Sequence, residues 1–393
     1  MSPRRVFFSP RWRAQGHPRQ AGFTLLELMI GLVLGLLSTL AITQIMTSFE
    51  GRKRTTMAGA DAQVNAGLAL SMLRQSVQMA GYGFASFDGS LGCSLSAQYN
   101  GAAITGFPAV LAPVSISDGG ANSAPDSIRI LHSSKTSFSV PLQLASPGYT
   151  AGDLSMPVAS VSGVLQGDLM VAIPKTVGQP CSVFQATAAP ATPTGSNPYT
   201  VEKLDNAWNA TGFPTLSYGI DALLANLGSL VDTTYGVNQT TGHLTANSFV
   251  LSSTYAPSYS GAQNMFGNVV NLQAYYGKDT NADGAVDRWD TSTPTTNDGW
   301  KQVLALRVAL VMRSDQFEKA EKDSANNKVY VTAANLLWDV GANTNIVDSN
   351  ATIASCGTSK CVTIKIDGLT NWQNYRYRIV DTVIPLRNVI WKS

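Results

Sequence analysis

The hydrophobic pattern of the chain begins with one long apolar run. Between Phe23 and Phe49 the only charged residue is Glu27. A helix rises about 1.5 Å per residue, so a helix over this run could cross a hydrocarbon layer of about 30 Å. The pattern therefore predicts a membrane-spanning helix over residues 23–46.

The helical pattern continues beyond the apolar run. Apolar residues recur at spacings of three and four at Met57, Ala60, Val64, Leu68 and Met72. This period is typical of the buried face of a helix. No proline interrupts residues 23–80, and a glycine follows at position 81, where it is suited to end a helix. We expect a helix over residues 23–80 whose second half lays this apolar face on a globular head.

After residue 80 the pattern changes to short β-type segments. Runs rich in Val, Ile, Thr and Tyr alternate with clusters of Gly, Pro, Asn and Ser, as in β-rich domains. The predicted strands are Ser127–Leu131, Leu169–Ile173, Ser248–Leu251, Val269–Tyr276, Val303–Met312, Lys328–Val331, Val362–Ile366 and Tyr375–Ile379. We expect a surface loop over residues 179–200 and a short helical patch over residues 219–230. The predicted fold class is α+β, with a long N-terminal helix packed on an antiparallel β-rich head over residues 81–393.

Composition narrows the class of protein. Charged residues are 13% of the 393 residues, hydrophobic residues are 44%, and the formal net charge is +2. These values exclude a disordered charged tail, a collagen, a small disulfide-dense domain and a polytopic membrane protein. They also argue against nucleic-acid binding through bulk positive charge.

The segment before the apolar run is basic. Five arginines (Arg4, Arg5, Arg11, Arg13 and Arg19) precede Gly22, and no acidic residue does. A secretory signal peptide is one interpretation, but the apolar run is too long and no small-residue cleavage site follows it. A plain membrane anchor is another, but it leaves unexplained a carboxylate at Glu27, where burial in lipid is costly.

The residues Gly22-Phe23-Thr24-Leu25-Leu26-Glu27-Leu28-Met29-Ile30 resemble the class III prepilin motif of type IV pilins and type II secretion pseudopilins. The resemblance implies that a prepilin peptidase cuts between Gly22 and Phe23 and methylates the new N-terminus, so that residues 1–22 are a leader peptide. It also implies that Glu27 pairs with the N-terminal amine of a neighbouring subunit during assembly. An ion pair would relieve the cost of both charges in an apolar setting.

Two segments of the head carry the resemblance further. Residues 300–314 and 375–389 are similar to the C-terminal strands of the PilW family of minor pilins. The fold implied is pilin-like, with the N-terminal helix serving as membrane anchor and filament core. The function implied is initiation or capping of type IV pilus assembly. A minor pseudopilin of a type II secretion system remains an alternative, as does a membrane-anchored periplasmic hydrolase or binding protein.

The resemblance also implies partners and a location. The partners are prepilin peptidase, other minor pilins, the major pilin and the inner membrane, and a tip adhesin is compatible with this role. Five arginines precede the span and three basic residues (Arg52, Lys53 and Arg54) follow it directly, which favours a cytoplasmic N-terminus and a periplasmic head. After assembly the head would lie on a pilus at the cell surface, in a filament that serves motility, adhesion or DNA uptake.

An Asp-rich segment is the strongest candidate for metal binding. Asp279, Asn281, Asp283, Asp287 and Asp290 place oxygen side chains at positions 1, 3, 5, 9 and 12 of a loop with Gly at position 6, as in EF-hand-like calcium loops. The carbonyl of Ala285 would be a further ligand. Position 12 is Asp where an EF-hand has Glu, and Asp-Gly also favours a hairpin turn. Calcium binding and a simple turn both remain open.

The cysteine count is compatible with two disulfides in an oxidising compartment. Cys356 and Cys361 are close enough in sequence to pin a hairpin, which leaves Cys93 to pair with Cys181. The sequence has no GxSxG, HExxH, P-loop or GxGxxG motif, so we expect no catalytic residues and no enzymatic activity.

Overall fold

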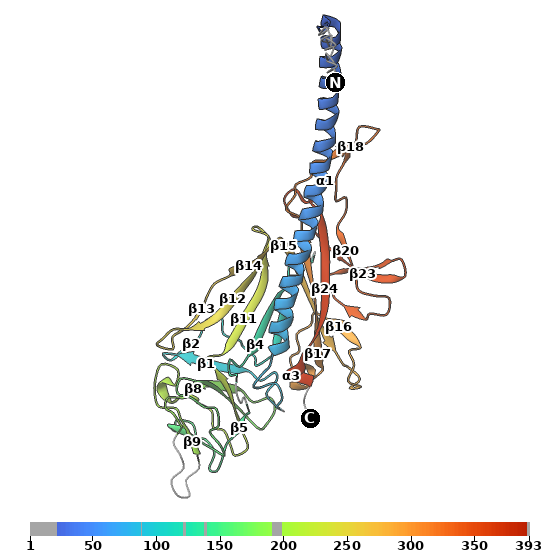
Figure 1. Ribbon diagram of the computed structural model, residues 1–393. Coiled ribbons are helices and arrows are strands. Elements are labelled where there is room, and N and C mark those ends of the chain that lie inside the picture. Colours follow the sequence, from blue (N-terminus) through green and yellow to red (C-terminus); the bar gives the residue numbers. More distant parts are fainter. Residues whose placement is uncertain (1–21, 88, 121–122, 137–139, 191–198, 391–393) are drawn as a thin grey trace, which may run out of the picture. The chain divides into compact units, whose positions relative to one another are not determined.

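The computed structural model describes residues 22–87, 89–120, 123–136, 140–190 and 199–390. The leader expected over residues 1–22 lies outside this range except for Gly22. The chain divides into two compact units, one ending at Thr56 and one beginning at Met57. One helix, α1 (Leu25–Met79), contributes to both units. The expected arrangement of a long apolar N-terminal helix followed by a β-rich domain is confirmed (Figure 1).

Gly81 follows the end of α1 and has a φ of 77°, in the left-handed region that favours glycine. Its N–H donates to the carbonyl of Leu131 at 2.8 Å. The chain therefore leaves the helix by a bond to a strand of the head.

Three larger sheets form the second unit. The first has the order β2-β1-β8-β7-β10-β5. Its strands are β1 (Leu95–Tyr99), β2 (Ala102–Ala103), β5 (Leu142–Gln143), β7 (Leu169–Ile173), β8 (Cys181–Gln185) and β10 (Leu223–Gly228). The second has the order β13-β12-β11-β4-β3, and β14 also pairs with β12. Its strands are β3 (Val114–Ser117), β4 (Ser127–His132), β11 (Val231–Asn238), β12 (His243–Leu251), β13 (Pro257–Tyr259) and β14 (Gln263–Gly267).

The third sheet has the order β21-β16-β15-β17-β24. Its strands are β15 (Val269–Lys278), β16 (Arg288–Asp290), β17 (Val303–Arg313), β21 (Ile346–Val347) and β24 (Tyr377–Pro385). Smaller sheets pair β6 (Ser155–Val158) with β9 (Tyr199–Glu202), β18 (Glu321–Lys322) with β19 (Lys328–Val329), and β20 (Leu336–Asp339) and β22 (Thr352–Cys356) with β23 (Ser359–Ile364). The short helices are α2 (Asn297–Lys301) and α3 (Arg387–Ile390).

The third sheet lies between two cores because the side chains of its central strands alternate. Leu272 and Leu310 belong to the main core, which also holds the buried face of α1. Tyr275 and Val311 belong to a separate core with residues of β20 and β23. Strands buried on both faces read as continuous apolar runs, which is why the sequence predicts β15 and β17 well.

The face of α1 that packs on the head is not the expected one. Met57, Val64 and Leu68 are 55–61% exposed. The buried residues of the helix are instead Ala62, Ala66, Ala69, Leu73 and Val77. Both faces repeat with a helical period, so periodicity could not separate them. The buried face begins with three alanines, whereas the expected face carries mostly larger apolar side chains.

Two further expectations about the head were wrong. The helical patch over residues 219–230 is strand β10, which is central in its sheet and buried at five of its six residues. A short, fully buried apolar run has no period that tells strand from helix. The loop expected over residues 179–200 contains strand β8. Its Pro- and Thr-rich portion over residues 191–198 lies outside the described residues.

Candidate functional site

The residues of the processing motif lie immediately before α1. Gly22, Phe23 and Thr24 have no regular secondary structure, and Phe23 is 86% exposed. A Cβ added to Gly22 would meet no atom within 4 Å, and its φ is not in the left-handed region. The fold of the described chain therefore does not itself require glycine at this position.

Thr24 and Glu27 form a capping box at the start of α1. The Glu27 N–H donates to the Thr24 hydroxyl at 3.3 Å, and the Thr24 N–H donates back to Glu27 Oε2 at 3.2 Å. This reciprocal pair satisfies two backbone donors at a helix start. The Thr-x-x-Glu spacing is visible in the sequence, but the sequence argument assigned Glu27 only to assembly. All hydrogen bonds of this carboxylate to described residues involve Oε2, so Oε1 has no partner among them.

No other described residue of its unit covers the apolar part of α1. Residues 25–47 form a candidate membrane span with a mean hydropathy of 2.3, and none of the window is buried. Its large apolar side chains are each more than half exposed. A surface of this size and apolarity indicates contact with lipid or with other apolar helices.

The first half of the Asp-rich loop closes on itself. Asp279, which is 7% exposed, accepts the Gly284 N–H at 2.8 Å and the Asp283 N–H at 3.2 Å. The Asn281 amide donates to Asp283 at 3.0 Å. Gly284 has a φ of 85°, so the turn itself requires this glycine.

The second half of the loop is held by other partners. Asp287 accepts the Thr280 N–H at 2.9 Å. Asp290 is 1% exposed and lies in β16, where it pairs with Lys278 at 2.7 Å and Arg288 at 2.9 Å. The structure therefore does not bring Asp290 to the expected position-12 ligand site. Among the described residues, the four loop carboxylates do not gather three ligand atoms within 4.8 Å of one another.

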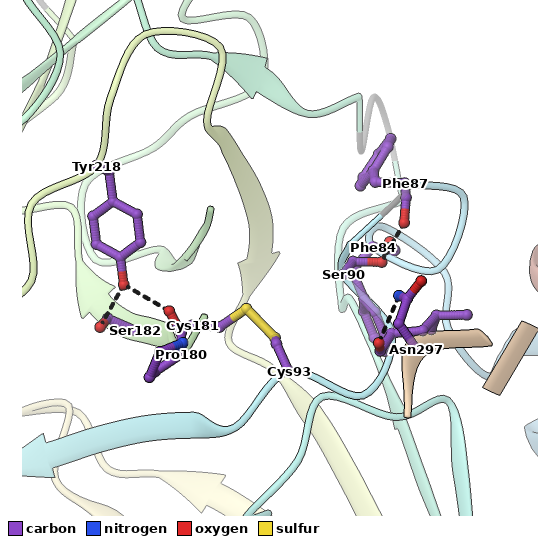
Figure 2. The surroundings of a disulfide bond; sticks show 10 residues. Phe84, Phe87, Ser90, Cys93, Pro180, Cys181, Ser182, Tyr218 and Asn297 are labelled. Atoms are coloured by element: carbon purple, nitrogen blue, oxygen red, sulfur yellow. Dashed lines mark hydrogen bonds between the residues drawn. A yellow bond between two sulfur atoms is a disulfide. The ribbon is translucent and has the colours of Figure 1, made fainter. Parts of the chain in front are cut away.

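Both expected disulfides are present. Cys93 and Cys181 join the segment after α1 to the start of β8, and the parallel pairing of β1 with β8 begins beside them. Figure 2 shows the polar contacts around this bond, where Tyr218 donates to Ser182 at 2.7 Å and Asn297 donates to the Leu91 carbonyl at 2.8 Å. The disulfide therefore fixes the chain's entry into the first sheet.

The second disulfide joins Cys356 to Cys361 across the turn between β22 and β23. Asp339 lies within 4.8 Å of both sulfur atoms. Because the two sulfurs are bonded to each other, they are not free thiolates to bind a metal.

The two head segments that resemble the PilW family lie side by side. β17 and β24 pair antiparallel along nine residues, from Ala305 opposite Pro385 to Arg313 opposite Tyr377. Just after β24, the Asn388 amide donates to the carbonyls of Gln78, Met79 and Ala80 at 3.0–3.3 Å. These carbonyls lie at the C-terminal end of α1, where the last carbonyls of a helix have no hydrogen-bond partners within the helix. The sequence argument missed this role of Asn388.

Comparison with known proteins agrees with this arrangement. A family model for type IV pilus-assembly protein W matches residues 218–388, which include β10 to β24 and Asn388. A model of the prokaryotic N-terminal methylation motif matches residues 17–43. The structure of a type IV-like pilin from Thermus thermophilus aligns with 10% sequence identity and a TM-score of 0.29. The alignment covers 83% of this chain and 97% of that pilin. No curated protein sequence matches the chain. Residues 218–388 of this chain therefore match the PilW family of type IV pilus-assembly proteins, and its N-terminus carries an N-terminal methylation motif.

Proposed function

We propose that this protein is a minor pilin that helps to initiate or cap a type IV pilus. The observation that carries the proposal is the methylation motif at the start of an apolar helix that no other described residue of its unit covers. Prepilin peptidase would cut between Gly22 and Phe23 and methylate the new amine. The helix would anchor the subunit in the inner membrane, with the head in the periplasm, and would then enter the filament with other minor pilins and the major pilin.

Glu27 has a defined place in this proposal. Its Oε2 caps the start of α1, and its Oε1 is open to a partner. A neighbouring subunit's N-terminal amine could pair with Oε1 without disturbing the capping box. An ion pair that is also hydrogen-bonded can tolerate an apolar surrounding, whereas an unpaired carboxylate there is costly.

The exposed face of α1 within the second unit supports subunit contacts. Met57, Val64 and Leu68 are more than half exposed at helical spacing. In this proposal, they pack against apolar side chains of adjacent subunits in the filament.

Mass spectrometry of the N-terminus, in membrane and sheared-filament fractions, tests the proposal. The mature chain should begin at methylated Phe23, and Gly22→Trp should leave full-length precursor in the membrane. An uncut wild-type N-terminus would contradict the proposal and favour an anchored hydrolase or binding protein. Loss of secretion rather than of pili, on deletion of the gene, would favour the type II secretion alternative.

A matched pair of variants tests Glu27. Glu27→Ala should be inserted and cleaved normally but should not enter filaments. Glu50→Ala removes an exposed carboxylate of the same helix and should enter filaments as the wild type does. Incorporation of both variants at wild-type levels would show that the carboxylate of Glu27 is not needed for assembly.

We also propose that the Asp-rich loop binds calcium, with Asp279, Asn281, Asp283, the Ala285 carbonyl and Asp287 as ligands. Asp290 is left out because Lys278 and Arg288 hold it. Hydrogen bonds within the turn already hold the side chains of Asp279, Asn281 and Asp283 beside one another. For an extracellular-type affinity of about 10⁻⁴–10⁻³ M, calcium at about 10 mM would stabilise the head by about 2 kcal/mol.

Thermal unfolding of the detergent-solubilised chain in calcium and in EDTA tests this site. Wild type and Asp290→Asn should both melt at a higher temperature in calcium than in EDTA, although Asp290→Asn should be less stable in both. Asp283→Ala should lose the difference. If the wild type melts equally in calcium and in EDTA, the segment is only a turn.

A further inference from the structure

The two six-stranded sheets each end in a short strand, and these two strands border one groove. β2 is the terminal strand of the first sheet and β13 is the terminal strand of the second. The groove has a volume of ≈ 350 Å³ and is lined by Tyr99, Ala102, Ala103, Thr105, Ser258 and Tyr259, among others. β2 and β13 lie at the same margin of the head in Figure 1. A missing strand between them would join the two sheets.

The backbone of β2 presents hydrogen-bonding groups to this groove. Asn100 and Gly101 both have positive φ, at 53° and 75°, so the β1–β2 turn is type I′. Its closing pair, Tyr99 and Ala102, exchanges the ladder bonds. In an antiparallel ladder the next pair does not, so the N–H and C=O of Ala103 point to the outer side of β2.

The backbone of β13 does the same from the opposite wall. Ser260 donates to the Ser248 carbonyl at 2.9 Å, and Ser252 donates to the Ala256 carbonyl at 3.0 Å. The alternation of an antiparallel ladder then turns the N–H and C=O of Tyr259 away from β12. Within the described part of the chain, no strand pairs with the outer side of β2 or of β13.

A buried ion pair fixes the two walls relative to each other. Arg129 donates through Nη2 to the Gly106 carbonyl, which follows β2, and to the Tyr259 hydroxyl of β13, both at 2.8 Å. Asp232, which is 1% exposed, binds the same guanidinium and accepts from Tyr259 at 2.6 Å. A groove whose walls are already fixed loses little conformational entropy when a ligand enters.

We propose that this groove binds an extended, uncharged segment of a partner protein, which adds as a strand between β2 and β13. Strand addition supplies affinity through main-chain hydrogen bonds and selectivity through alternate side chains. None of the residues that line the groove is charged, so a charged side chain entering it would lose hydration without a partner. The rings of Tyr99 and Tyr259 offer apolar contacts to small or β-branched side chains, while the Tyr259 hydroxyl stays bound to Arg129 and Asp232. The proposal goes beyond pilus assembly and does not depend on it.

Binding of a synthetic strand to the detergent-solubilised chain tests the proposal. The probe is a fluorescent, amidated heptapeptide, Ser-Thr-Val-Ser-Val-Thr-Ser, which is uncharged and β-prone. Wild type should bind it saturably, and binding should protect the amides of Ala103 and Tyr259 from hydrogen exchange. The same peptide N-methylated at alternate residues loses its donors to one of the two edges, so its affinity should fall about tenfold or more.

A matched pair of variants locates the binding. Ala103→Glu places a charge in the groove and should weaken peptide binding at least about tenfold. Ala151→Glu makes the same change at another exposed turn residue and should leave binding unchanged. No saturable binding to wild type, equal binding of the N-methylated peptide, or protection elsewhere in the head would each overturn the proposal.

Discussion

Replacing Asp126 with asparagine should remove a pH dependence from the stability of the head. Asp126 is 3% exposed and joins two sheets at the start of β4. Its N–H donates to the Leu272 carbonyl of β15 at 2.8 Å. Its carboxylate accepts the N–H groups of Ala274 at 2.8 Å and Gly119 at 2.9 Å. The side chain thus occupies the edge of β15 that no strand covers there.

The pKa of Asp126 is raised from 3.8 to about 7, mainly by burial; the hydrogen bonds from Gly119 and Ala274 lower the pKa in part, and the nearby carboxylates of Asp118 and Asp348 add to the increase. Because the pKa of Asp126 is higher in the folded state than in the unfolded state, only the folded state keeps this carboxyl protonated at pH values between the two pKa values. The resulting stability is present at low pH and is lost as pH rises toward 7. Ionisation of Asp126 should therefore lower the free energy of unfolding of the wild type by about 2–3 kcal/mol between pH 5 and pH 8.

Asp126→Asn keeps the shape of the side chain but cannot ionise and has one acceptor oxygen instead of two. At pH 5 the variant should be less stable than wild type by about 1–3 kcal/mol, the cost of a buried N–H without a partner. At pH 8 the variant should be about as stable as the wild type, or more stable. The assay is thermal unfolding of both chains, followed by tryptophan fluorescence, at pH 5, 6, 7 and 8.

The difference between the two proteins is the informative quantity. Burial lowers the pKa of His132, so protonation of this histidine destabilises the head as pH falls. This effect is common to both chains and cancels in the difference. Asp298→Asn, at a side chain that is 91% exposed, should show a difference from wild type that is constant with pH. If the Asp126→Asn difference is equally constant from pH 5 to pH 8, the reasoning is refuted.

Three further predictions concern packing and crosslinks. Asn388→Ala should lower the free energy of unfolding by about 1–3 kcal/mol because it leaves carbonyls at the end of α1 without partners, and denaturant unfolding of the purified chain measures it. Loss of the Cys93 disulfide should lower the free energy of unfolding by about 4–5 kcal/mol and loss of the Cys356 disulfide by about 2 kcal/mol, since the first closes a much longer loop. Equal shifts of the denaturation midpoint for the two Cys→Ala pairs would contradict this. Ala69→Leu should destabilise by about 1–3 kcal/mol through overpacking, whereas Leu68→Ala should leave melting within a degree or two and reduce entry into filaments.

The elements that could be predicted from sequence are those whose signal is local. α1 and the buried strands β7, β15 and β17 each have a locally apolar sequence. The structure places these elements close to the expected bounds. The disulfides followed from counting and spacing. β24 begins two residues later than expected and ends six residues later, because its second half alternates exposed and buried positions without a strong apolar run.

The features that could not be predicted depend on residues far apart in the chain. Asn388 caps a helix that ends about 300 residues earlier, and no local pattern announces such a contact. The groove is formed by two short strands from different sheets, so neither strand indicates it alone. Asp290 matched a metal-ligand position in spacing, but its pairing with Lys278 is a property of the β15–β16 hairpin.

The two faces of α1 in the second unit show how packing inside the chain and contacts outside it can divide one helix. The buried face carries Ala62, Ala66 and Ala69, and larger residues follow only at Leu73 and Val77, all within the main core. The exposed face carries Met57, Val64 and Leu68, which would contribute more hydrophobic free energy if they were buried in the head. A sequence selected only for a stable monomer would place the larger residues inside. The opposite arrangement is what a subunit needs if its helix must bind the head closely on one side and other helices on the other.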